Sequence, residues 1–128
     1  MATVLSEVET LRIEVVKPGY LNVYYPPMCT PKSLDEFYPR FIEILKAQPD
    51  KSCVIGDFSE TQRAPFSAAI RGVHWMPQTK PYMRRVAGFG FHPLFENIIR
   101  SILIMSGRQD IRLFKTRAEA EAWAFEGL

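Results

Sequence analysis

The side chains best suited to chemistry follow the apolar run of residues 52–58. Asp57 ends this run, and Ser59, Glu60 and Thr61 come directly after it. Parallel α/β sheets bind their ligands at the ends of such strands. An aspartate here can also cap the loop, because its carboxylate accepts backbone N–H groups. Both roles remain open for Asp57, and Ser59 and Thr61 are further candidates for contact with a ligand or a partner.

The order of the other reactive residues argues against catalysis and metal binding. His74 and His92 are the histidines of the chain, and neither is spaced to lie beside a nucleophile. We expect His74 on the solvent side of a helix, and His92 is a candidate for ligand or partner contact. Cys29 and Cys53 lack a metal-type spacing with histidine. We therefore predict that the protein is not an enzyme and uses no cofactor and no metal.

Basic residues collect in the second half of the chain. Residues 61–128 hold 10 Lys and Arg against 5 Asp and Glu, whereas residues 1–60 hold 6 against 9. Arg84 and Arg85 begin one apolar run and could contact an anion or an acidic partner. The alternative is that they are solvated charges that protect an edge strand. The net charge of +2 is too small to indicate a nucleic-acid partner, and no apolar run is long enough for a membrane span.

The strands that must position these residues follow from the spacing of apolar and turn-forming residues. Residues 11–25 alternate apolar and polar side chains around Lys17-Pro18-Gly19-Tyr20. This pattern is typical of a β-hairpin with a type II turn. Short apolar runs predict three further strands, at residues 52–58, 84–91 and 111–114.

Helices alternate with these strands and define the fold class. Their expected signals are a capping box from Ser33 to Glu36, Pro65 and Pro77 at the two ends of a second helix, Pro93 at the start of a third, and Thr116 as the cap of a fourth. Strands that alternate with helices pair in parallel through right-handed crossovers. We therefore predict an α/β fold, with an N-terminal β-hairpin followed by right-handed β-α units that form a mostly parallel sheet. Residues 1–9 are expected to be a flexible terminus, and residues 10–128 a single domain.

Glycines interrupt two of the expected strands. Gly56 lies inside one, and Gly88 and Gly90 lie two residues apart in the next, so these two share a face. Glycine within a strand often marks the close approach of another group. Tight packing of a helix on the sheet is one explanation. The alternative is a cavity over the glycines that holds an apolar ligand, and we expect its lining to include Ile98, Ile102 and Met105.

Three stretches together resemble the SpoIIAA-like branch of the STAS (anti-sigma-factor antagonist) superfamily. They are CVIGDFSET, KPYMRRVAGFGF and IIRSILIMSGRQDIRLFKTRAEAEAWA, within a resemblance that extends over residues 10–125. The resemblance implies a SpoIIAA/STAS-like β-α superhelix and a small non-catalytic regulatory or protein-interaction module. Classical antagonists of this family bind a partner kinase and are switched by phosphorylation of a serine at a helix N-terminus. Relatives of this fold include lipid-binding domains.

The sequence departs from the family pattern at the switch serine. The Asp-Ser-Ser-Gly motif is absent, and the corresponding stretch reads Ala64-Pro65-Phe66-Ser67. Ser67 is the nearest equivalent, and Ser59 is a second candidate for phosphorylation.

These observations predict a protein that works by contact. We expect a protein partner or a homodimer, in a cytoplasmic location, because the cysteines form no disulfide framework and the N-terminus does not resemble a signal peptide. The alternative function is that of a small protein that binds an apolar molecule or lipid in a pocket between the sheet and the helices.

Overall fold

The strands pair into a mostly parallel sheet, as the sequence predicted. The computed structural model describes residues 3–8, 11–61 and 66–126, and in these ranges six strands form one sheet in the order β1-β2-β3-β4-β5-β6. The hairpin pairs are antiparallel, and the pairs from β3 to β6 are parallel. The strands are β1 (Thr3–Val8), β2 (Leu11–Lys17), β3 (Tyr20–Tyr24), β4 (Ser52–Asp57), β5 (Met83–Phe89) and β6 (Ile111–Phe114).

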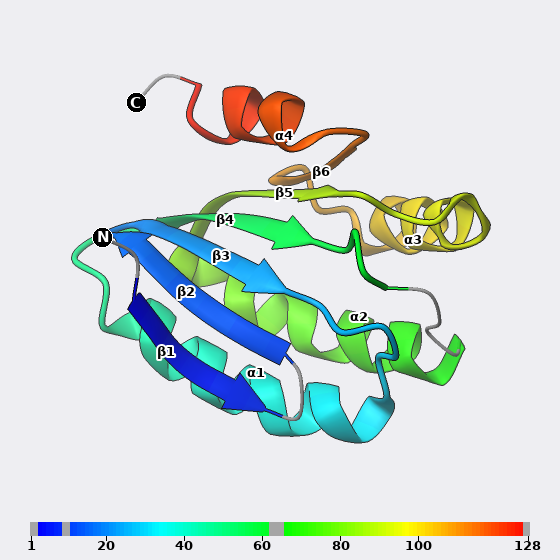
Figure 1. Ribbon diagram of the computed structural model, residues 1–128, viewed down its shortest axis with the longest axis horizontal. Helices are drawn as coiled ribbons and strands as arrows, with labels where there is room; N and C mark the ends of the chain where they lie inside the picture. Colours follow the sequence, from blue (N-terminus) through cyan, green and yellow to red (C-terminus); the bar gives the residue numbers. More distant parts are fainter. Residues whose placement is uncertain (1–2, 9–10, 62–65, 127–128) are drawn as a thin grey trace.

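Helices cover the two faces of the sheet unequally. They are α1 (Pro31–Lys46), α2 (Phe66–Thr79), α3 (Pro93–Ser106) and α4 (Arg117–Ala124), with a short 3₁₀ turn, η1 (Lys80–Tyr82), before β5. The pair α1 and α2 lies along one face, and the short α4 lies on the opposite side near β5 and β6 (Figure 1). Over β2, the face opposite α1 therefore carries none of the described helices, and this part is called the open half of the face below.

The larger core lies between the sheet and α1. Phe37, Phe41 and Leu45 recur at the four-residue spacing that puts side chains on one helix face, and all three are buried. They pack in one cluster with Leu21 and Val23, which alternate along β3. A smaller cluster, built around Ile55, Ala87, Phe89, Ala120 and Ala124, joins α4 to the other face.

The start of α1 corrects one prediction. Thr30 is the N-cap, because its Oγ1 accepts a hydrogen bond from the Ser33 amide at 3.1 Å while Ser33 Oγ accepts one from the Thr30 amide at 3.2 Å. The capping box is therefore Thr30–Ser33, and the predicted box of Ser33 and Glu36 is wrong. Pro31 fits the first helical position, where its missing N–H and fixed φ cost nothing.

Two other boundaries differ from their predictions. Pro77 lies inside α2, which continues to Thr79, because a proline in the last turn forfeits only one hydrogen bond near a terminus. Residues 3–8 form β1 and pair with β2, although a flexible terminus was expected there. The outer edge of β2 offers unpaired backbone groups that such a segment satisfies. The predicted start of α2 at Pro65 lies outside the described residues.

Candidate functional site

Asp57 organises the turn that follows β4. Its Oδ1 accepts hydrogen bonds from the Ser59 amide at 2.9 Å and from Ser59 Oγ at 2.6 Å. The same turn is braced by hydrogen bonds from the Phe58 amide to the Phe89 carbonyl and from the Thr61 amide to the Phe58 carbonyl. The loop-capping role predicted for Asp57 is thus present, and it displays the exposed Ser59 on a fixed turn.

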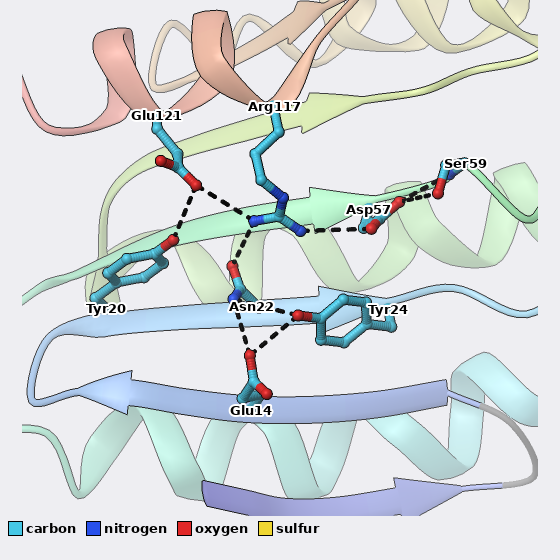
Figure 2. A network of polar contacts seen from close by, with 8 residues as sticks. All are labelled: Glu14, Tyr20, Asn22, Tyr24, Asp57, Ser59, Arg117 and Glu121. Atoms are coloured by element: carbon cyan, nitrogen blue, oxygen red, sulfur yellow. Dashed lines mark hydrogen bonds and ion pairs between the residues drawn. The ribbon is translucent and has the colours of Figure 1, made fainter. Parts of the chain in front are cut away.

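Arg117, the first residue of α4, joins this turn to the open half of the sheet face. Its Nη2 lies 3.4 Å from Asp57 Oδ2, and its Nη1 lies 3.4 Å from both Glu121 Oε1 and Asn22 Oδ1. Its guanidinium carbon lies 4.9 Å from the centre of the Phe89 ring. Figure 2 shows that the side chain reaches down from α4 between Glu121 and Asp57. One long side chain therefore connects three segments far apart in sequence.

Glu14 on β2 forms the other end of this network (Figure 2). Its Oε1 accepts hydrogen bonds from Asn22 Nδ2 and from the Tyr24 hydroxyl, both at 3.0 Å. The Asn22 hydrogen bond is the main cause that lowers the pKa of Glu14 below its ordinary value. Burial, followed by the hydrogen bond to Glu14, raises the pKa of Tyr24. The carboxylate therefore stays charged and the phenol neutral.

We call this network the polar edge. Its members are Asp57, Ser59, Arg117, Glu121, Asn22, Tyr24, Tyr20 and Glu14. It suits recognition by charge and hydrogen bonding. The Ser59 hydroxyl donates its hydrogen bond to the Asp57 carboxylate, which fixes the direction of the side chain. Among the described side chains, no group of three His, Cys, Asp or Glu residues could hold a metal ion.

Arg84 and Arg85, both candidates for partner contact, lie away from the polar edge. Arg84 donates to the carbonyls of Ala124, at 2.8 Å, and of Glu126. Arg85 Nη1 donates to the Trp123 carbonyl at 2.7 Å, and its guanidinium lies 4.8 Å from the centre of the Trp123 ring. These carbonyls lie at the end of α4 and just beyond it, where positive charge is favourable. The two arginines therefore fasten α4 to the sheet.

The other candidates fall into different surroundings. Thr61 is buried, and its Oγ1 donates to the Pro26 carbonyl at 2.9 Å. Ser67 is exposed, as the second residue of α2. His92 is exposed at the start of α3 and lines the cavity described below. The turn thus brings Asp57 and Ser59 together, with the buried Thr61 in the same turn. The structure does not place Arg84, Arg85, Ser67 or His92 with them.

An aromatic stack explains the strand glycines. Gly56 and Gly88 are register partners on β4 and β5. Phe58 stacks on Tyr25 with ring centres 3.9 Å apart and on Phe91 with ring centres 4.3 Å apart. A Cβ on Gly56 would lie 3.2 Å from the Phe58 ring, and one on Gly88 would lie 2.9 Å from the Phe91 ring. The groups that come close to Gly56 and Gly88 are therefore aromatic rings and not a helix packed on the sheet.

Gly90 corrects the predicted course of β5. The strand ends at Phe89, and Gly90 has a φ of +81°, which favours glycine. The chain turns there, so Phe91 lies over Gly88 and not on the opposite face of a continuing strand.

A cavity of about 220 Å³ lies between the sheet and helices α1, α2 and α3. The stack of Tyr25, Phe58 and Phe91 contributes to its lining, together with Gly56 and Gly88. A cavity next to the strand glycines is therefore present. The side chains predicted to line it, those of Ile98, Ile102 and Met105, lie outside the part of the chain that the structure describes. The described side chains that α3 contributes are Ile99 and Leu103.

Arg108 is a buried cation at this cavity. Its side chain is 4% exposed and is paired with Asp110, which accepts from Nε at 2.8 Å and also from Nη2. Nη1 donates to the Met76 carbonyl at 2.7 Å and lies 3.4 Å from Thr79 Oγ1. The signal in the sequence for this ion pair is the two-residue spacing of Arg108 and Asp110. Because such spacings are common in exposed loops, it does not indicate a buried pair.

Comparison with known proteins identifies the fold and not a function. No protein-family model and no curated protein matches the sequence. An uncharacterised protein of the DUF3478 family with a SpoIIAA-like fold, from Shewanella loihica PV-4, is similar at 15% identity and a TM-score of 0.63, over 97% of this chain and 92% of that one. The unphosphorylated anti-sigma factor antagonist SpoIIAA is similar at 9% identity and a TM-score of 0.66, over 93% and 100%.

A membrane protein contains a similar domain. The murine anion transporter solute carrier 26 family member A9 matches at 17% identity and a TM-score of 0.62, over 96% of this chain and 22% of the transporter. In this chain, none of the helices in the described ranges is long and apolar enough to cross a bilayer. These likenesses define the class as the α/β fold of SpoIIAA and STAS domains. The chain has this SpoIIAA-like fold, as its sequence indicated.

Proposed function

We propose that this chain is a non-catalytic regulatory module that binds a protein partner through its polar edge. The observation that carries the proposal is the exposed Ser59, held by Asp57 on a braced turn next to Arg117. Charged and hydrogen-bonding groups on a fixed turn recognise a partner without first being ordered. The SpoIIAA likeness supports a regulatory role, since that protein is an anti-sigma factor antagonist. A cytoplasmic location and the absence of catalysis belong to this proposal.

Phosphorylation of Ser59 is the regulation that this geometry supports best. A phosphate on Ser59 Oγ would replace the 2.6 Å hydrogen bond to Asp57 with repulsion between two anions. Arg117, which lies 3.4 Å from Asp57, is the nearby cation that could turn to the phosphate. Ser67 on the first turn of α2 is the second candidate, where the helix dipole favours a phosphate.

The test compares two variants that add the same charge at exposed serines. Ser59→Glu places a carboxylate at the polar edge, and Ser101→Glu places one on α3. In quantitative capture from a native lysate of the source organism, we expect the wild type and Ser101→Glu to recover the same protein. Ser59→Glu should recover it less well, on the order of tenfold, through like-charge repulsion with Asp57. Equal recovery by Ser59→Glu, or no enriched protein, refutes the proposal.

A second candidate function, the binding of a small apolar molecule, is favoured by the cavity. The cavity also limits that function. A cavity of about 150 Å³ holds one benzene ring, so the 220 Å³ found here cannot enclose a lipid with two long acyl chains. A lipid carrier is therefore not what the cavity supports.

A further inference from the structure

We propose that the cavity between the sheet and helices α1, α2 and α3 binds an uncharged apolar molecule about the size of a substituted benzene. This inference rests on the second candidate function and specifies its ligand. It does not depend on a partner at the polar edge.

The shape and lining of the cavity set the size and the apolar character of the ligand. Scaled from benzene in a cavity of about 150 Å³, the 220 Å³ available accommodates about nine non-hydrogen atoms. The stack of Tyr25, Phe58 and Phe91 offers aromatic surface, against which a flat ring packs well. The aliphatic lining includes Val54, Val73, Met76, Val86, Ile99 and Leu103.

The buried cation does not select an anionic ligand, because its donors are used within the protein. A guanidinium has five N–H donors. Those of Arg108 point to both Asp110 oxygens, the Met76 carbonyl, Thr79 Oγ1 and Met83 Sδ. A carboxylate in the cavity would have to displace Asp110, and it would also lose its own hydration. A neutral molecule meets neither penalty.

The hydroxyl groups around the cavity are also engaged. The Thr61 hydroxyl donates to the Pro26 carbonyl, and the Thr79 hydroxyl donates to the Met76 carbonyl. A bound water needs two to four polar partners, and these engaged hydroxyl groups offer few, so the lining favours an apolar guest. His92 lines the cavity and is exposed, so it marks a place where the cavity reaches solvent.

Gly72 provides a way to fill the cavity without removing any contact. It lines the cavity from α2, and a Cβ built on it meets no atom of the described residues within 4 Å. Gly72→Leu therefore puts a side chain into the space that the ligand would occupy. Gly72→Ala is the matched control, because it makes the same helix-favouring change and leaves most of the volume empty. Both variants should unfold at or above the wild-type Tm, so loss of folding does not confuse the result.

The experiment measures the Tm of the full chain by calorimetry with propylbenzene, a neutral probe of matching size, and with benzoate, an aromatic carboxylate with about the same number of non-hydrogen atoms. At about ten times its dissociation constant, propylbenzene should raise the Tm of the wild type and of Gly72→Ala by roughly 5 °C. It should leave Gly72→Leu unchanged, and benzoate should have little effect on any of the three.

Three results would overturn the inference. They are the absence of a shift in the wild type, an equal shift in Gly72→Leu, and an equal shift with benzoate. None of these results changes the outcome expected for Ser59→Glu and Ser101→Glu in the capture experiment. Failure of the cavity site and failure of the partner site can therefore be distinguished.

Discussion

Gly90→Ala tests how firmly the turn that displays Ser59 is held. Gly90 has a φ of +81°, and a residue with a Cβ loses about 1–2 kcal/mol in this conformation. The added Cβ would also lie 2.9 Å from the Ser59 amide nitrogen and 3.0 Å from its Cα. Both are backbone atoms, so the turn itself must move, and such overpacking costs about 1–3 kcal/mol. The free energy of unfolding should therefore fall by about 2–5 kcal/mol in total.

Two other glycines separate the conformational cost from the contact. Gly19 and Gly107 have φ values of +82° and +69°, and within the described part of the chain a Cβ on either meets no atom within 4 Å. Gly19→Ala and Gly107→Ala should thus cost only about 1–2 kcal/mol. Urea unfolding of the three variants gives the difference, and for 128 residues each kcal/mol corresponds to about 4 °C in Tm. If Gly90→Ala costs no more than the two controls, Gly90 does not brace Ser59 and the turn is not fixed as argued.

Two further substitutions test the buried and the partly buried charges. Arg108→Leu leaves Asp110 without its cation and should lower the free energy of unfolding by about 3–5 kcal/mol. The control, Arg40→Leu, changes an exposed arginine and should lower it by about 0.5 kcal/mol or less. Similar urea midpoints for the two variants would contradict the burial argument. Glu14 has a pKa lowered from 4.5, so its interactions stabilise the fold above that pH and are lost as the pH falls through the lower folded-state pKa. Glu14→Gln should flatten the loss of Tm below about pH 4.5, and an unchanged acid profile would refute the role of its hydrogen bonds.

The elements that the sequence predicted well depend on local signals. The last strand was expected at residues 111–114 and is found at Ile111–Phe114. Its following helix begins where Thr116 accepts a hydrogen bond from the Glu119 amide, as the capping pattern indicated. Both signals involve neighbours within a few residues, so no knowledge of the tertiary structure was needed.

The polar edge was only partly predictable. Asp57 and Ser59 were found because they follow a strand, but the partners of Arg117 lie on β3 and β4, up to 95 residues away in sequence. Strand alternation could have placed Glu14, Asn22 and Tyr24 on one face of the hairpin. It could not show that α4 leaves that half of the face open, since helix placement depends on packing over the whole sheet.

The aromatic stack shows where strand patterning fails. The strand predicted from Arg84 to Phe91 is apolar from Val86 onward, so period alone puts Gly88 and Phe91 on opposite faces. The positive φ of Gly90 reverses the chain and folds Phe91 back over Gly88. Glycine permits that conformation without requiring it, and only the approach of the Ser59 backbone to Gly90 shows that this glycine is needed.

The polar edge and the cavity share a single turn of backbone. Asp57 and Phe58 are consecutive, so their side chains leave β4 on opposite sides: Asp57 toward Arg117 on α4, and Phe58 into the lining of the cavity. A perturbation of this turn therefore reaches both surfaces, and Gly90→Ala cannot assign a function to either one. Ser59 points only to the polar edge, and Gly72 borders the cavity from α2. The two functions are tested at these positions, because Ser59→Glu retains the backbone hydrogen bond from the residue 59 amide to Asp57, and Gly72→Leu lies on α2, outside the turn.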